Sequence, residues 1–307
     1  MLIVGIDGLR PDVLREASAP AIQELARQGA YSFQALCQLE TQAGEWATHS
    51  GPGWASVLTG VWANKHGIVN NRFDRASRER LDGHPDLFWY VEQASEGRLA
   101  TASFTTWTPI NVYERRAPRA GVDDMRRDPD LRRAARGGVR GFVVRHADRQ
   151  RFRDFREGGD AAIEELAATW LREEAADLTF VLLSDVDVAG HETGYGSPAY
   201  GAAIEMTDRR VASLLAALEA RPERRGEDWL VIVTSDHGGR GREHSDGTLP
   251  ANRRVPLIVS GGASQRGAIQ PAPVIVDVVP TALAHLGIEV REEWSLDGRP
   301  VGLAGGR

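Results

Sequence analysis

The chain has a single cysteine, Cys37, among its 307 residues, so it cannot form an internal disulfide. Disulfides are typical of secreted proteins, and their absence favours a cytoplasmic location. No apolar run approaches the roughly 20 residues needed to cross a bilayer. Residues 1–7 read as a strand that leads into a candidate active-site loop, and no basic segment, apolar core and cleavage site precede it. We therefore expect neither secretion nor membrane attachment.

An excess of basic residues is also missing. Lysine and arginine total 37 against 43 aspartates and glutamates, which gives a net charge of −6. Proteins that bind nucleic-acid polymers normally present a basic surface, so this charge argues against such a partner. It does not exclude a small phosphate ester as substrate, because bound metal ions can reverse the sign of the charge inside a site. The sequence leaves the oligomeric state open.

What the sequence does contain is an alternation of short apolar runs and amphipathic stretches. The runs at residues 2–6, 178–183, 229–233 and 255–259 are continuous, as in strands buried on both faces of a mostly parallel sheet. Helical spacing marks residues 20–28, 161–176, 198–220 and 276–286. The alternation predicts an α/β fold, specifically an α/β/α sandwich around a mostly parallel central sheet.

The middle of the chain differs from both ends. From about residue 70 to residue 160 it is rich in arginine, aspartate and glycine, with one further candidate strand at 99–104. The stretch 114–159 is the most polar part. We interpret the chain as a single catalytic domain, residues 1–307, with a cap-like insertion around 70–160 beside the active site. A solvated surface loop is the alternative.

Candidate metal ligands follow the ends of the apolar runs, where ligands bind in open α/β sheets. Asp7 comes directly after the first run, and a buried carboxylate there is costly unless it is paired or binds a cation. The alternative is that Asp7 caps the next helix. Asp187 and His191 follow the second run and bracket a glycine-containing turn, so both can reach one ion. Asp185 either belongs to this site or supports it.

A third cluster follows the run at 229–233. Asp236 and His237 come first, two glycines then permit an irregular loop, and His244 lies shortly beyond. So many carboxylates and imidazoles at three strand ends are hard to explain by packing. Two ions, each with about three protein ligands and an open position, match a catalytic site, with zinc as first choice and manganese as second. Two metals about 4 Å apart serve in-line phosphoryl transfer.

Residues 48–60 supply a candidate nucleophile. Pro52 favours the first turn of a helix that ends near Gly60. Ser50 then lies at the helix N-terminus, where free amides and the helix dipole favour anions. A neighbouring metal would lower the pKa of the Ser50 hydroxyl enough for attack at neutral pH. The alternative is that Ser50 only caps the helix.

Together these clusters resemble the alkaline phosphatase superfamily, and within it the type I phosphodiesterase/nucleotide pyrophosphatase branch. The motifs that carry the resemblance are residues 4–12, 50–71, 187–191 and 235–244, in the family's order. The resemblance implies an alkaline phosphatase-like domain with two Zn²⁺ per chain. It implies one ion bound by Asp187, His191 and His244, and the other bound by Asp7, Asp236 and His237, with the nucleophile hydroxyl touching the second ion.

The resemblance places Ser50 at the nucleophile position, with Thr48 as the fallback because this branch usually uses threonine. The branch commonly has an asparagine three residues after the nucleophile, where it helps to hold the phosphoryl oxygens. Gly53 stands there instead, so its backbone amide or another side chain has to bind the substrate. Asn71, at the end of the segment 50–71, is the other residue expected to contact substrate.

These observations favour a phosphodiesterase or nucleotide pyrophosphatase that acts on a small phosphate ester through a phosphoseryl intermediate. The first alternative is a phosphomonoesterase with the same metal site. A sulfatase would need a Cys/Ser-x-Pro-x-Arg context, and residues 50–54 lack the arginine. A phosphomutase would need a larger cap domain. A catalytically silent binding protein on this fold is expected to have lost ligands.

Overall fold

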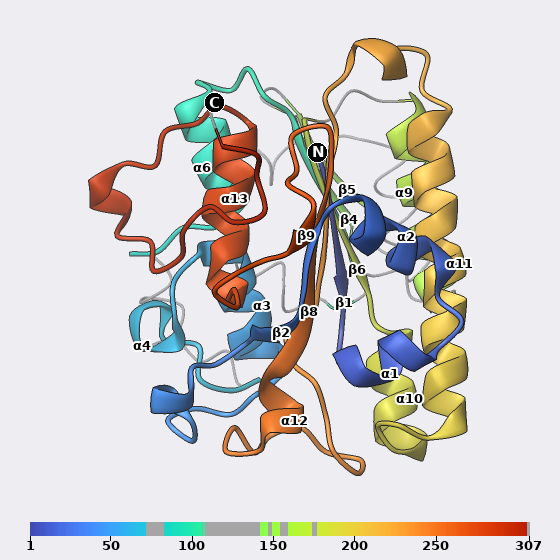
Figure 1. The fold of residues 1–307 in the computed structure, drawn as a ribbon. Coiled ribbons are helices and arrows are strands. Elements are labelled where there is room, and N and C mark those ends of the chain that lie inside the picture. Colours follow the sequence, from blue (N-terminus) through green and yellow to red (C-terminus); the bar gives the residue numbers. More distant parts are fainter. Residues whose placement is uncertain are drawn as a thin grey trace.

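The structure is a computed structural model, and it describes residues 1–71, 83–105, 107, 142–146, 149–153, 159–173 and 177–305. A central sheet separates two layers of helices (Figure 1). One layer contains α3 (Ser50–Thr59), α4 (Ala63–His66), α6 (Leu87–Ala94) and α13 (Val278–His285). The other contains α1 (Pro11–Glu16), α2 (Pro20–Gln28), α9 (Gly159–Glu173), α10 (Asp185–Thr193) and α11 (Pro198–Glu219).

The sheet has nine strands among the described residues, in the order β5-β4-β3-β6-β1-β7-β8-β2-β9. Their bounds are β1 Leu2–Ile6, β2 Ala30–Leu36, β3 Thr101–Phe104, β4 Phe142–His146, β5 Arg149–Arg153, β6 Leu178–Leu183, β7 Leu230–Thr234, β8 Arg254–Gly261 and β9 Gly267–Ala268. The central strands β3, β6, β1 and β7 run parallel. The pairings of β4 and β5 at one side, and of β8 with β7 and β2 at the other, are antiparallel.

Shorter elements complete the description. Helix α12 (Pro250–Arg253) lies at the lower end of the sheet in Figure 1, between β7 and β8 in the chain. Single 3₁₀ turns occur at Glu40–Gln42, Arg224–Gly226, Ile275–Asp277 and Glu292–Trp294. None of the helices in the described part of the chain is long and apolar enough to cross a membrane.

The register of the central strands determines where the polar residues meet. Every residue of β1 is buried, and β1 pairs with β6 on one side and with β7 on the other. Ile6 lies opposite Leu183, and Gly5 lies opposite Thr234, so the three strands end at the same edge of the sheet. The segments that follow them therefore converge below β1 in Figure 1.

Two apolar clusters, one on each face of the sheet, hold the layers together. On the face covered by α3, the rings of Trp54 and Phe88 make edge contacts with Phe180, at centroid distances of 5.9 and 6.4 Å. Such pairs add to the stabilisation that comes from burying the rings. The Trp54 ring also lies where a side chain on Gly5 would stand, because a Cβ there would be 2.5 Å from Trp54 Cη2. Close packing thus fixes α3 against β1.

The α/β sandwich and its parallel centre agree with the fold class predicted from the sequence. The predicted helices correspond to α2, α9, α11 and α13, and the predicted strands to β1, β3, β6, β7 and β8. Two features differ. β8 runs antiparallel, a direction that an apolar run does not specify. β2 was not predicted, because its large side chains Tyr31 and Phe33 are only half-buried while the small Ala30 and Ser32 face the interior.

Most of the region predicted as an insertion around 70–160 lies outside the described residues, including most of 114–159. Within it, β4 pairs with β3, and β5 pairs with β4, so both extend the central sheet at one edge. The cap-like role of the remainder stays a prediction.

Candidate metal centre and nucleophile

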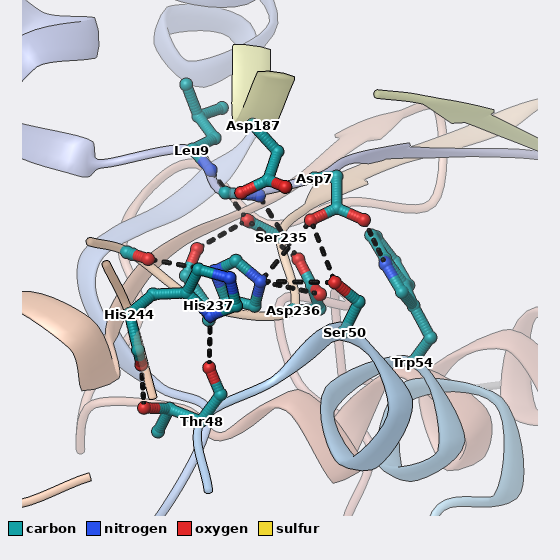
Figure 2. A network of polar contacts seen from close by, with 12 residues as sticks. Asp7, Leu9, Thr48, Ser50, Trp54, Asp187, Ser235, Asp236, His237 and His244 are labelled. Atoms are coloured by element: carbon teal, nitrogen blue, oxygen red, sulfur yellow. Dashed lines mark hydrogen bonds and ion pairs between the residues drawn. The ribbon is translucent and has the colours of Figure 1, made fainter. Parts of the chain in front are cut away.

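The residues predicted to bind metal come together at the edge where β1, β6 and β7 end, opposite the first turn of α3 (Figure 2). They fall into two neighbouring groups. The first consists of Asp7, Asp236 and His237, which are all buried. The second consists of Asp187 and His244 together with His237, with His191 alongside. No helix cap is formed by Asp7, since α1 begins after Arg10 without a side-chain cap.

In the first group, His237 Nε2 is the common point. It lies 3.3 Å from Asp7 Oδ1 and 3.3 Å from Asp236 Oδ2. Gly8 N donates to Asp236 Oδ1 over 3.2 Å, and Trp54 Nε1 donates to Asp7 Oδ2 over 3.0 Å. Each carboxylate thus has one oxygen bound by a donor and the other turned towards the imidazole.

In the second group, Asp187 and His191 both come from α10. The sequence suggested a turn between them, but the segment is a helix, and the four-residue spacing places both side chains on one face. His191 Nε2 lies 3.5 Å from Asp187 Oδ2 and 3.1 Å from His244 Nε2. The His244 ring stacks on His237 with a centroid distance of 3.7 Å and an interplanar angle of 9°. Asp185 points elsewhere and pairs with Arg210 over 3.0 Å.

Backbone carbonyls fix the same tautomer in all three histidines. Nδ1 of His237 lies 2.8 Å from the carbonyl of Gly238, Nδ1 of His244 lies 2.6 Å from that of Thr48, and Nδ1 of His191 lies 2.9 Å from that of Arg242. A carbonyl oxygen only accepts, so each Nδ1 carries the proton and each Nε2 keeps its lone pair. Every Nε2 then faces the shared centre of the site.

These lone pairs and carboxylates fit a cation better than they fit one another. The Nε2 atoms of His191 and His244 face each other at 3.1 Å with no proton between them. Asp236 Oδ2 is buried and accepts no hydrogen bond from the part of the chain that the structure describes. Buried charges and polar atoms normally have partners. Imidazole nitrogen and carboxylate oxygen are the donors that zinc takes in catalytic sites.

The electrostatics of the site lead to the same conclusion. Burial, together with the charges of Asp236 and Asp187, raises the pKa of Asp7 well above its usual range. Burial and the charge of Asp187 do the same for the pKa of Asp236. Burial lowers the pKa of His237, and burial together with His237 lowers the pKa of His244 to about 3. Several carboxylates and neutral imidazoles in one buried place form an environment that a divalent cation would stabilise.

Ser50 is the first residue of α3, and its side chain is directed into the first group (Figure 2). Its Oγ lies 3.4 Å from Asp7 Oδ1 and 3.3 Å from His237 Nε2. The hydroxyl does not cap the helix, because the N-cap residue is His49 and no side-chain cap bond forms. The Thr48 hydroxyl instead donates to the carbonyl of His244. Of the two predicted nucleophile candidates, Ser50 is the one that faces the carboxylates.

The residues predicted to bind substrate have different surroundings. Gly53 N donates to the carbonyl of His49 within the helix, over 3.0 Å, so its amide is not available for the predicted contact. A Cβ on Gly53 would lie 2.6 Å from Asp236 O, which excludes an asparagine at this position. Asn71 Oδ1 accepts a hydrogen bond from Gly51 N over 2.7 Å, and Asn71 thus lies at the N-terminus of α3.

Sequence reasoning missed two donors to the predicted ligands. Trp54 donates to Asp7 from 47 residues away, and the Tyr195 hydroxyl donates to Asp187 Oδ1. The signal for Trp54 is its spacing from Ser50, one helical turn along α3. For Tyr195, the only indication in the sequence is the presence of Gly190 and Gly239, the two glycines against which its ring packs.

Comparison of the whole sequence with known proteins identifies a family. The sequence matches the family named type I phosphodiesterase/nucleotide pyrophosphatase over residues 1–258. It is similar to the bis(5′-adenosyl)-triphosphatase ENPP4 of Bos taurus, with 23% identity over 244 residues that are 78% of this chain and 47% of that protein. It is also similar to the phosphopentomutase of Methylobacterium sp. (strain 4-46), with 33% identity over 132 residues that are 43% of this chain and 30% of that protein. The chain thus spans about half the length of the bovine relative and less than a third of the length of the phosphopentomutase.

Solved structures show the same fold. Human ectonucleotide pyrophosphatase/phosphodiesterase 5 superposes with a TM-score of 0.67 at 14% identity, over 95% of this chain and 96% of that one. A 2-O GAG sulfatase superposes with a TM-score of 0.63 at 15% identity, over 98% of this chain and 72% of that one. At these identities the likeness shows the fold alone.

Proposed function

Because the chain belongs to the type I phosphodiesterase/nucleotide pyrophosphatase family, we propose that it is a metal-dependent hydrolase of phosphodiester or pyrophosphate bonds in small phosphate esters. The bovine relative is named a bis(5′-adenosyl)-triphosphatase, which is the reason to place pyrophosphate bonds between nucleosides among the first substrates to test. A phosphomonoesterase with the same residues is the alternative, and the two differ only in the substrate that fits.

One observation carries the proposal. The Ser50 hydroxyl stands at the N-terminus of α3, within 3.4 Å of Asp7 Oδ1 and 3.3 Å of His237 Nε2. Its helix contributes the positive end of its dipole, which favours a phosphoryl group there. A nucleophile, an anion-binding helix end and a candidate cation site thus meet at one point, as phosphoryl transfer requires.

We assign two divalent ions to the site, zinc as first choice and manganese as second. The donors are imidazole nitrogens and carboxylate oxygens without a thiolate, which suits either metal. In this assignment one ion is held by Asp7, Asp236 and His237, and the other by Asp187, His191 and His244. Bound there, divalent ions lower the pKa of a neighbouring hydroxyl and balance the negative charge of the phosphoryl oxygens.

Ser50 provides the covalent chemistry in the proposed reaction. Its Oγ, after losing a proton to solvent, forms a bond to phosphorus while the bond from phosphorus to the leaving oxygen breaks. The leaving oxygen takes up a proton from solvent. A water molecule then cleaves the bond between Oγ and phosphorus, which releases the phosphate product and restores the Ser50 hydroxyl.

Asn71 is proposed to hold a phosphoryl oxygen in place of a side chain at position 53. Its Oδ1 accepts from Gly51 N over 2.7 Å, so its NH₂ group is the part left to donate to substrate. The glycine at position 53 lets α3 approach Asp236 closely, and Asn71, in the loop after α4, would supply the side-chain amide in its place.

The test compares Ser50→Ala with Thr48→Ala on a nitrophenyl phosphodiester and a nitrophenyl phosphomonoester, with zinc content measured in each preparation. Ser50→Ala should lower kcat by on the order of 10³-fold or more, because nucleophile and metals act as a unit. Its zinc content should change little. Thr48→Ala should remain within roughly 10-fold of the wild type, since it loses only an outer hydrogen bond.

Other outcomes have defined meanings. Near-normal turnover in Ser50→Ala together with an inactive Thr48→Ala would move the nucleophile two residues upstream. Near-normal turnover in both variants would mean that water attacks phosphorus directly. Active protein without a transition metal would overturn the metal assignment. The ratio of diester to monoester turnover in the wild type decides between phosphodiesterase and phosphomonoesterase.

A further inference from the structure

Tyr195 lies between the segments that carry the metal ligands, although it is not itself a candidate ligand. Its main chain is fixed at two points: Tyr195 N donates to the carbonyl of Gly241 over 2.7 Å, and Arg10 Nη1 donates to the carbonyl of Tyr195 over 3.0 Å. Gly241 follows β7, and Arg10 follows β1. The residue is therefore tied to both loops that border the site.

The Tyr195 ring fills a slot between two glycines. A Cβ on Gly190 would lie 2.5 Å from Tyr195 Cε1, and a Cβ on Gly239 would lie 2.3 Å from Tyr195 Cδ1. Gly190 precedes His191 on α10, and Gly239 lies two residues after His237. Because any larger residue at either position would push the ring out, the ring position depends on both ligand motifs.

From this slot the Tyr195 hydroxyl donates to Asp187 Oδ1. The same oxygen is enclosed on its other side by Gly8, where a Cβ would lie only 2.5 Å away. The second oxygen, Oδ2, faces His191 Nε2 at 3.5 Å. The pKa of Tyr195 is raised by burial and by Asp187, so the phenol remains a hydrogen-bond donor.

We propose that Tyr195 is a positioning residue that makes Asp187 a one-oxygen metal ligand and thereby sets the ion affinity of the α10 position. The inference rests on the proposed function, because it assumes that Asp187 binds an ion. Outer hydrogen bonds of this kind orient ligands and typically change metal affinity by roughly 10–100-fold. The effect is confined to one position, because Tyr195 makes no hydrogen bond to Asp7 or Asp236 among the contacts that the structure describes.

The matched control is Tyr200, a second buried tyrosine whose ring centroid lies 5.5 Å from that of Tyr195. Its hydroxyl donates to the carbonyl of Gly8 over 2.6 Å and accepts from Arg10 N over 2.9 Å. Tyr200→Phe therefore loses buried hydrogen bonds to the same loop without touching a ligand side chain. Tyr195→Phe keeps the ring in its slot and removes only the hydroxyl.

The experiment titrates Zn²⁺ and Co²⁺ into metal-free wild type, Tyr195→Phe and Tyr200→Phe, with circular dichroism to verify folding. Tyr195→Phe should weaken one of two binding steps by roughly 10–100-fold and leave the other unchanged. The visible Co²⁺ spectrum of the weakened step should also change, because Asp187 is free to bind through both oxygens. Tyr200→Phe should lower thermal stability while keeping both affinities and both spectra.

Four results would overturn the inference. Unchanged Zn²⁺ affinities and Co²⁺ spectra in Tyr195→Phe would show that the hydroxyl does not act on Asp187. Equal weakening of both steps, or the same change in Tyr200→Phe, would show a general packing effect. If the wild type bound no ion, the metal assignment under the proposed function would fail as well. If the wild type bound two ions and Tyr195→Phe bound them with the same affinities, only the inference about Tyr195 would fail.

Discussion

The two groups of candidate ligands differ in how far the protein encloses them. The side chains of Asp7, Asp236 and His237 are at most 5% exposed. Asp187 is 15% exposed and His191 is 41% exposed. The first group is thus built into the sheet edge. In the second group, Asp187 and His191 lie on one face of the short helix α10, whereas His244 is buried in the loop after β7.

The buried group is held by groups that the fold itself fixes in place. Gly8 N and Trp54 Nε1 donate to its two carboxylates, and Leu9 N donates to the neighbouring Ser235 Oγ over 2.9 Å. Ser235 Oγ in turn donates to the carbonyl of His237 over 2.9 Å. These donors come from the loop after β1, from α3 and from the loop after β7, so the geometry of the buried group follows from the sheet and from the packing of α3.

Asp187 and His191, the α10 group, are held by other contacts. Their helix starts where Asp160 accepts from Ser184 N and Asp185 N, each over 2.8 Å, and the Asp187 carboxylate is held by Tyr195. We infer that the two groups have different roles, a division in which the buried group fixes the position of Ser50 and the α10 group is the adjustable half, whose metal affinity can change without displacing Ser50.

The largest difference is expected between Asp236→Ala and His191→Ala. Asp236→Ala removes a fully buried candidate ligand from the group that Ser50 faces, so both zinc binding at the buried position and kcat should fall by more than the roughly 100-fold typical of an outer partner. His191→Ala should weaken only the α10 position. Zinc content after dialysis, competition with a chromogenic chelator and turnover of a nitrophenyl diester measure these effects. Equal losses at both positions in both variants would contradict the division.

The sequence could predict that the candidate ligands lie together, because the order and direction of the strands determine where they meet. Once residues 2–6, 178–183 and 229–233 are strands of one parallel sheet, their carboxyl ends must meet, and the polar residues that follow meet with them. The helix N-terminus at Ser50 could also be predicted from nearby residues. Pro52 marks the first turn of the helix, and Gly60, in the left-handed conformation with φ of 72°, ends it. Local patterns therefore gave both the candidate ligands and the candidate nucleophile.

The parts that could not be predicted depend on contacts between distant segments. The donation from Trp54 to Asp7 and the slot for Tyr195 between Gly190 and Gly239 exist only after α3 and α10 pack on the sheet. The lack of a free amide at Gly53 also follows from packing, because the helix begins early enough for that amide to bond to His49. Periodicity contains no information on such pairings.

A pH experiment tests the support of the α10 half. Burial, followed by the charge of Asp185, raises the pKa of Asp160 from 3.8 to about 6. Because the folded value lies above the unfolded one, the protonated carboxyl stabilises the fold at low pH, and this contribution is lost as the pH rises through about 6. The free energy of unfolding of the wild type relative to Asp160→Asn should therefore fall by up to roughly 3 kcal/mol between about pH 4 and pH 7.

Urea unfolding of both proteins in a chelating buffer measures this difference, because groups that do not interact with Asp160 titrate alike in the two proteins and cancel. A difference that stayed constant over this pH range would show that Asp160 titrates normally. A difference that increased with pH would show that its two backbone hydrogen bonds, rather than burial, dominate its pKa.

The smallest effect tests how tightly the buried half is packed, by comparing Gly53→Ala with Gly201→Ala. A Cβ on Gly53 would lie 2.6 Å from Asp236 O and 2.7 Å from Asp236 Cβ, so α3 must move away from the buried group. Overpacking of this kind costs about 1–3 kcal/mol, and a nucleophile displaced by about 1 Å loses on the order of 100-fold in rate.

Gly201 lies within α11 with no atom within 4 Å of its Cβ position, so alanine there should stabilise the helix by about 0.5–1 kcal/mol and leave turnover unchanged. Urea unfolding and turnover of the two variants measure both effects. If Gly53→Ala were as stable and active as Gly201→Ala, the contact between α3 and Asp236 would not fix Ser50, and the buried half would be as adjustable as the α10 half.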